Sequence, residues 1–297
     1  MRKRCQNPLA ITFTMGVCRM IPDRFSCDFE RDGYYFPLDA LDDQEVGVYR
    51  ERLQEILDSD HASRLGNRGQ INNLHVFSPH VNEIIRTPAI LDAVEQIVGP
   101  DILVWSTGIF VKPAHSASFV SWHQDLTYWG LSSDRQVSVW LAFSPVNEEN
   151  GCMRFLPGSH RHGQLPHEDI VDQENLLTRG QRAVIDFDES ESVRVELEPG
   201  QASLHHGHLL HCSGPNHSDH PRLGLVITYL STSIRQTKSE TDYAMLVRGT
   251  DEFRHFRDIP KPKALFDDDS LAFHREMLVN LNEVLYDGAK NRESAIT

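Results

Sequence analysis

Short β-rich runs separated by turns fill the middle of this chain, from Ile102 onward. Gly and Pro residues punctuate the intervals between the runs, and many short strands with such punctuation are typical of a β-sandwich or a barrel. The sequence therefore predicts a β-rich core at about residues 101–232. The runs predicted as strands are 102–112, 136–144, 153–156, 193–198, 201–206 and 222–232.

Length and composition suggest how the rest of the chain is organised. With 297 residues, 39% of them hydrophobic, it can bury one large core or two small ones. No repeat, low-complexity tract or Pro/Gly-rich linker divides it, so residues 21–297 are predicted to form a single domain. We expect a helical N-terminal part at about residues 21–100 and a C-terminal region at 233–297. Residues 1–20 are predicted to be a disordered extension.

Helices are predicted N-terminal to the β-rich core. Residues 43–59 have an apolar stripe and acidic residues in the first turn. Residues 81–98 predict one or two further helices, because Thr87 resembles an N-cap before Pro88 and Gly99 stands just past the end. The stripe of the first helix is formed by Val46, Val48, Tyr49, Leu53, Ile56 and Leu57.

A further helix is predicted at residues 270–286, where apolar side chains recur at helical spacing. We expect this stripe to pack against the outside of the β-rich core. A homodimer contact through the same stripe is the alternative.

A histidine and an aspartate stand two positions apart in the tripeptide His123-Gln124-Asp125. On an extended strand, residues i and i+2 share a face, so His123 and Asp125 can bind one ion while Gln124 points away. Two imidazoles and one carboxylate are the facial ligand set of non-haem Fe(II) oxygenases, which leaves three adjacent metal positions open. An isolated downstream His211 can supply the second imidazole.

Four ordered sequence blocks carry these residues. The first contains the tripeptide within Ser121–Gly130, and the second is the tryptophan-bearing run 136–144. The third, 147–160, contains Asn-Gly and ends in Pro-Gly-Ser-His, and the fourth runs from His211 to Arg222. This arrangement resembles the phytanoyl-CoA dioxygenase family of Fe(II)/2-oxoglutarate-dependent oxygenases. The resemblance covers about residues 100–232 well and the N-terminal third loosely.

The resemblance implies roles for individual residues. It makes His123, Asp125 and His211 both the iron ligands and the catalytic centre. With this placement the fold is expected to be mainly β with flanking helices, a double-stranded β-helix (the jelly roll also used by cupins), with the metal at its mouth.

The resemblance also implies a co-substrate site for 2-oxoglutarate. Arg222 would bind the distal carboxylate, which suits the planar, permanently charged fork of a guanidinium. Ser213 would help to hold the co-substrate, and Trp140 matches a position that lies against it. For Trp140, ordinary core packing is an equal alternative.

Three further histidines lie in the seven residues that end at His211. His206 is the alternative third ligand, but His211 is preferred because Ser213, Asn216 and Arg222 stand at the family offsets from it. We expect His206 to pack near the metal as a buried neighbour of the ligands.

Zinc is the rival metal. A closed structural zinc site usually takes four ligands that include thiolates. The five cysteines form no C-x2-C pair, so such a site is not expected. Catalytic zinc held by two histidines and a carboxylate stays open on ligand type alone.

The function implied by the resemblance is a dioxygenase that uses Fe(II), 2-oxoglutarate and O2 to hydroxylate, or otherwise oxidise, an unactivated C–H bond of a small-molecule metabolite. Succinate and CO2 are the co-products. Asp125 favours such oxidation over halogenation, since related halogenating enzymes have a small residue at the carboxylate position. Two alternatives stay open: a metal-binding jelly-roll protein without turnover, and a cupin-type metal-dependent hydrolase or isomerase.

Two segments are candidates for substrate selection. Residues 161–192 carry many charges between two predicted strands, and we expect this long loop to cover the active site. Residues 233–268 contain basic side chains that could frame an anionic substrate, with a solvated surface as the alternative. These side chains are Arg235, Lys238, Arg248, Arg254 and Arg257.

Charge and composition exclude several classes of partner. The formal net charge is 29 − 43 = −14, and no basic stripe is present for a nucleic-acid backbone. No apolar run approaches the roughly 18 residues that a membrane span requires. Five cysteines without paired spacing favour a reducing compartment, and we expect a cytoplasmic location.

Overall fold

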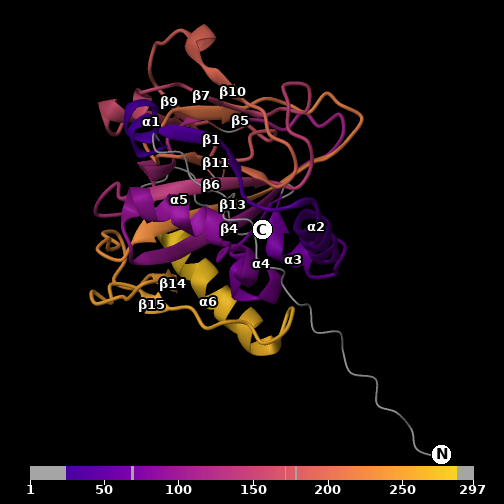
Figure 1. Ribbon diagram of the computed structural model, residues 1–297, viewed down its shortest axis with the longest axis vertical. Helices are drawn as coiled ribbons and strands as arrows, with labels where there is room; N and C mark the ends of the chain where they lie inside the picture. The colour runs from indigo at the N-terminus through magenta and orange to yellow at the C-terminus, as the bar shows by residue number, and fades with distance from the viewer. Residues whose placement is uncertain (1–24, 68–69, 171, 178, 286–297) are drawn as a thin grey trace, which may run out of the picture.

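The computed structural model describes residues 25–67, 70–170, 172–177 and 179–285. The extension predicted at residues 1–20 lies outside these residues. The described chain is mainly β, with two sheets stacked face to face and helices on the outer side of the larger one (Figure 1). This is the predicted jelly-roll arrangement, the cupin-like double-stranded β-helix. The sheets do not close into a barrel, because no strand of one pairs with a strand of the other in the described part.

The larger sheet has nine strands, and its main path runs β1-β11-β6-β13-β4-β14-β15. The strands of this path are β1 (Tyr34–Asp39), β11 (Gln201–His205), β6 (Gln136–Ala142), β13 (Arg222–Ser231), β4 (Ile102–Lys112), β14 (Tyr243–Arg248) and β15 (Arg257–Asp258). Two short strands, β3 (Gln70–Asn72) and β2 (Gly66–Asn67), extend the sheet from β4. Every pairing except that of β14 with β15 is antiparallel.

The smaller sheet has four strands in the order β10-β7-β12-β5. They are β10 (Val193–Val195), β7 (Met153–Phe155), β12 (His211–Ser213) and β5 (Val120–His123). A separate hairpin of β8 (His167–Asp169) and β9 (Gln181–Ala183) lies within the segment predicted as a long loop. The strands β5 and β12 were not among the predicted runs.

The central strands of the larger sheet are buried on both faces because their side chains alternate between two environments. On β6, Val137, Val139 and Leu141 belong to the main core, which also includes side chains of the outer helices. Ser138 and Trp140 point to the other side, toward the smaller sheet. The strand therefore separates an apolar layer from a layer that can hold polar groups.

The N-terminal helices follow the prediction closely. Helix α1 covers Phe25–Asp32 and α2 covers Asp43–Leu57, where Asp42 and Glu45 form a capping box, an arrangement that stabilises a helix by about 1 kcal/mol. Val48 was wrongly placed on the buried stripe of α2, since it is 42% exposed. A short helix, α3, covers Ala62–Leu65.

Two helices occupy the region predicted at residues 81–98. They are α4 (Pro79–Ile84) and α5 (Pro88–Val98). Thr87 is the N-cap residue of α5 without a side-chain cap, and Gly99 ends the helix with a φ of 96°, a backbone conformation that glycine adopts readily. Helix α5 packs across β6 and β13.

The C-terminal helix α6 covers Asp268–Leu285. Leu271 and Met277 join the main core, so the prediction that this stripe packs back on the β-rich core is confirmed. In the described part of the chain, no helix combines the length and the apolar composition that crossing a membrane requires.

Candidate active site

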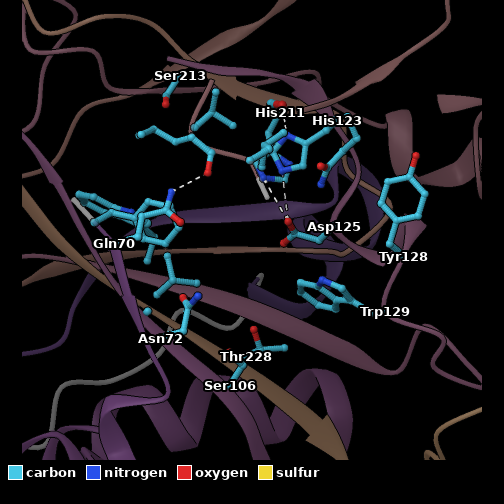
Figure 2. Close-up of a pocket in the computed structure, with 18 of the residues that line it drawn as sticks. Gln70, Asn72, Ser106, His123, Asp125, Tyr128, Trp129, His211, Ser213 and Thr228 are labelled. Carbon is cyan, nitrogen blue, oxygen red and sulfur yellow. Dashed lines mark hydrogen bonds and ion pairs between the residues drawn. The ribbon is translucent and has the colours of Figure 1, made fainter. Parts of the chain in front are cut away.

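Three predicted side chains meet between the two sheets (Figure 2). His123 ends β5 and His211 begins β12, and the two are paired directly across these strands. Their ring centroids are 4.1 Å apart. Asp125 Oδ1 lies 3.3 Å from His123 Nε2 and 3.6 Å from His211 Nε2. Each residue thus offers one ligand atom, all within 4.8 Å of one another, and the group could hold a metal ion.

The backbone around the tripeptide explains this geometry. The chain stays extended at Gln124 before Asp125 begins a 3-10 turn, η2 (Asp125–Thr127), so His123 and Asp125 face the same side as predicted. Gln124 points away, and its Nε2 donates to the carbonyl oxygens of Gly163 (2.8 Å) and His208 (2.7 Å). These bonds anchor the tripeptide to the segments on either side.

Hydrogen bonds to backbone carbonyls orient the two imidazoles. His123 Nδ1 lies 2.9 Å from the Ser121 oxygen, and His211 Nδ1 lies 3.0 Å from the Leu209 oxygen. A proton on each Nδ1 leaves the Nε2 lone pair free for a metal. Burial lowers the pKa of His211 well below its usual value, which keeps this ring neutral as a ligand must be.

The second oxygen of Asp125 is held by neighbouring strands. Ser138 Oγ donates to Oδ2 at 2.9 Å, and His205 Nε2 lies 3.2 Å from the same atom. Burial by itself would raise the pKa of Asp125, but the histidines around it hold that pKa well below its usual value. The Asp125 carboxylate is therefore an anion. Its Oδ2 contacts Ser138 and His205, and its Oδ1 faces His123 and His211.

His205, rather than His206, is the additional histidine at this site. It is 3% exposed and its Nδ1 has no hydrogen-bond partner. His206 Nε2 instead lies 3.7 Å from Asp134, and its ring is next to that of His160. The prediction that His206 packs beside the ligands is wrong.

Arg222 is buried in the same space and has no carboxylate partner among the described residues. Its side chain is 2% exposed, donates to the Gly151 carbonyl and leaves Nε without a hydrogen bond. Burial lowers its pKa to about 10, so it stays charged at neutral pH. Its guanidinium carbon lies 5.3 Å from the centre of the Trp140 ring. Gly224 makes room for this tryptophan, because a Cβ at that position would overlap the indole.

A second buried basic residue, Lys112, was not predicted from the sequence. It ends β4 directly opposite Arg222, and its Nζ donates to Ser213 Oγ at 2.8 Å and to the Gly214 carbonyl. Burial, and then the charge of Arg222, lower its pKa to about 6. The available signal was a single lysine closing an otherwise uncharged strand.

A cavity of about 200 Å³ connects these groups. The triad, Trp140, Ser213 and Arg222 line one part of it. The other part is lined by the apolar or aromatic side chains Trp105, Tyr128, Trp129, Leu176, Leu281 and Leu285. Gln70, Asn72, Ser106 and Thr228 add neutral polar groups there.

Within the segment 161–192, four described residues between 176 and 181 line the cavity. One of them, Arg179, lies against the Tyr128 ring, with 3.8 Å between the guanidinium carbon and the ring centre. Arg179 also bonds Asp169 at 2.6 Å and the Leu285 carbonyl at 3.2 Å. The loop, the segment after the triad and the end of α6 thus meet at the rim. None of the five basic residues predicted at 233–268 lines the cavity.

Known proteins resemble the chain over most of its length. Residues 29–224 match the phytanoyl-CoA dioxygenase family. A "probable alpha-ketoglutarate-dependent hypophosphite dioxygenase" of Stutzerimonas stutzeri is 29% identical over 162 residues, which are 54% of this chain and 56% of that protein. Ectoine dioxygenase of Streptomyces avermitilis is 26% identical over 226 residues, covering 68% of this chain and 76% of that protein.

Solved structures agree with these matches. The apo form of a non-heme monooxygenase, ThoJ, shares 34% identity and superimposes with a TM-score of 0.79, covering 90% of this chain and 100% of that one. Its nickel complex gives 32% identity and a TM-score of 0.74, covering 89% and 99%. The chain therefore belongs to the phytanoyl-CoA dioxygenase family of Fe(II)/2-oxoglutarate-dependent oxygenases.

Proposed function

We propose that this protein is a dioxygenase that hydroxylates an unactivated C–H bond of a small-molecule metabolite, with 2-oxoglutarate as co-substrate and succinate and CO2 as co-products. The observation that carries the proposal is the presence of Arg222, buried and without a carboxylate partner in the described structure, in the same cavity as the triad. When bound, Fe(II) and 2-oxoglutarate supply the oxidising chemistry by reducing O2.

The triad residues fit the metal by donor type. His123 and His211 would each contribute Nε2, and Asp125 would contribute Oδ1. Because Ser138 and His205 occupy Oδ2, the carboxylate is restrained to one metal contact. Three protein ligands would leave the rest of the metal's coordination sphere open to small molecules such as 2-oxoglutarate. Ser138 and His205 are thus positioning residues in this proposal.

Arg222 would bind the distal carboxylate of 2-oxoglutarate. Its Nε has no partner, and a buried cation without a counter-charge gains strongly from a carboxylate. Lys112, opposite Arg222, would take up a proton as the carboxylate binds, and it fixes Ser213 through the bond from Nζ to Oγ. Trp140 would form the wall beside the co-substrate, since its ring lies next to the Arg222 guanidinium and it is two residues from Ser138 on β6.

A small substrate is supported by the enclosed cavity and by the curated relatives, whose names refer to hypophosphite and ectoine. The alternatives without oxygenase turnover account for the triad but give no role to Arg222. The single domain, the homodimer and the cytoplasmic location stay predictions.

The test is to add Fe(II) and 2-oxoglutarate to the apoprotein without oxygen and to record the visible metal-to-ligand charge-transfer band. We expect a band that disappears in His123→Ala and weakens in Arg222→Ala. His206→Ala is the matched control, since this nearby histidine faces Asp134, and it should keep the band. Absence of the band in a wild-type protein with confirmed iron binding would reject the proposal.

A further inference from the structure

A row of four polar side chains crosses the floor of the cavity. It runs His205–Ser138–Thr228–Ser106 over the adjacent strands β11, β6, β13 and β4, and each neighbouring pair is in direct register. In Figure 2, Thr228 and Ser106 lie across the cavity from the triad. A polar row in the centre of a buried sheet is unusual, because the apolar side chains of these strands otherwise form the core.

The two halves of this row differ in their partners. His205 and Ser138 both bond to Asp125, as described above. The hydroxyls of Thr228 and Ser106 have no hydrogen-bond partner in the described structure, and neither does the side-chain amide of Asn72, which lines the same floor. Thr228 is only 3% exposed. Ser106 and Asn72 are half-buried, so all three polar groups line the cavity and are open to hydrogen bonds from a ligand.

Among the described residues, none on the floor carries a charge that could match a charged ligand. The charged side chains lining the cavity are Asp125 in the metal group, Arg222 in the co-substrate part and Arg179, which is paired with Asp169. A carboxylate or ammonium group placed against Thr228 would lose its hydration without gaining a counter-charge. Hydroxyl and amide groups both donate and accept, and so match the floor.

The walls above the floor are aromatic and fixed in place. The rings of Trp105 and Trp129 are 5.1 Å apart. Trp105 Nε1 donates to Asp242 at 2.9 Å, and the Trp129 carbonyl accepts from Gln236 at 3.0 Å. The bond from Nε1 orients the Trp105 indole, and the Trp129 indole packs against it while its backbone is held by Gln236.

We propose that Thr228, Ser106 and Asn72 bind an uncharged hydroxyl or amide group of the substrate, whose apolar skeleton lies against Trp105 and Trp129. This inference rests on the proposed function, because it assigns the substrate part of the same cavity. The substrate class is an uncharged alcohol or amide on an apolar or aromatic skeleton, rather than a zwitterion or an organic anion.

A series of indoles that share one skeleton and differ in the terminal group tests this assignment. Indoleacetamide and tryptophol are neutral, indoleacetate is an anion and tryptamine is a cation. Binding of each to the Fe(II)- and 2-oxoglutarate-loaded protein is measured by calorimetry without oxygen. We expect the neutral members to bind at least tenfold more tightly than the charged ones. Thr228→Val and Ser106→Ala should each reduce that preference at least threefold.

The control is Thr250→Val, at an exposed threonine remote from the cavity, which should keep the preference. Tighter binding of a charged member, an unchanged preference in both floor variants, or binding of none of the four probes would overturn the assignment. A failure of the proposed function is separate, since the wild-type protein would then lack the charge-transfer band before any probe is added.

Discussion

The two parts of the cavity differ in how their side chains are held. In the part proposed to bind the metal and the co-substrate, His123, His211 and Arg222 lie on strands, each in direct register with a neighbour. In the part proposed to bind the substrate, the outer wall comes from described residues between 176 and 181 and from the end of α6, and Arg179 contacts both Tyr128 and Leu285.

This difference matches the different demands of the two parts. Metal ligands and a carboxylate-binding cation must be held in one geometry, and paired strands provide that. Loops tolerate sequence changes better than paired strands do. We therefore expect substitutions in the strand-borne part to alter co-substrate binding, and those at the rim to leave it intact.

Among substitutions in the strand-borne part, loss of Arg222 should weaken 2-oxoglutarate binding most. Removing one partner of a buried charge pair costs about 3 kcal/mol, or roughly a hundredfold in affinity. Arg222→Ala is expected to raise the Kd for 2-oxoglutarate by about that factor, as measured by anaerobic titration of the charge-transfer band. Arg222→Lys keeps a charge without the planar fork, so its Kd for 2-oxoglutarate should lie between those of the wild-type protein and Arg222→Ala. Equal affinity in all three proteins would contradict the assignment.

Loss of the bond from His205 to Asp125 should have the next largest effect. In His205→Leu the Asp125 carboxylate would lose one of the two bonds that hold Oδ2, and both of its oxygens would then be able to compete with 2-oxoglutarate for the metal. We expect about a tenfold loss of 2-oxoglutarate affinity with little loss of Mn(II) affinity, both measured by calorimetry. His205→Gln restores a donor and should recover part of the loss. Parallel weakening of both affinities would indicate a merely structural role.

Lys112 should make co-substrate binding depend on pH. Its pKa in the free protein is about 6, so it is neutral at pH 8. A carboxylate nearby would raise this pKa, so 2-oxoglutarate binding takes up a proton, and affinity should fall a few-fold as the pH rises from about 6 to 9. Calorimetry in buffers of different ionisation enthalpy measures this uptake. Lys112→Met should bind more weakly and take up no proton at this position.

A substitution at the rim of the cavity should change the stability of the loop and leave 2-oxoglutarate affinity unchanged. Arg179→Gln breaks the ion pair with Asp169 and should speed proteolysis within 161–192 a few-fold, while the Kd for 2-oxoglutarate stays unchanged. Arg182→Gln is the control, because its bond to Glu168 is exposed and lies away from the cavity. A shift in 2-oxoglutarate affinity in Arg179→Gln would break the distinction between the two parts.

The sequence predicts those parts of the site that are encoded locally or at a spacing typical of the family. His123 and Asp125 are two residues apart, and the offsets of Ser213 and Arg222 from His211 match the family. The structure brings all of these side chains to one cavity, and their roles there stay predictions. The long strands β4, β6 and β13 were predicted because several consecutive β-forming residues occur in each.

The residues that were missed become neighbours through strand register, which one sequence does not reveal. Lys112 faces Arg222 across β4 and β13, and His205 faces Ser138 across β11 and β6. The short strands β5 and β12 have too few residues to show an alternation. The exposure of Val48 reflects which side of α2 meets the core, and tertiary packing decides this.

Strand β13 fixes the distance between Arg222, proposed to bind 2-oxoglutarate, and Thr228, proposed to bind the substrate. Arg222 and Thr228 are six residues apart on one face of it, a separation of about 20 Å in a fully extended strand. Deleting or inserting one residue between them would turn one of the two side chains toward the helices, since alternate positions face opposite sides. Among descendants of this chain, length changes should therefore accumulate in the loops, while the six-residue interval in β13 is preserved. The distance between the proposed substrate contacts and the proposed co-substrate site should therefore stay the same as long as that interval does.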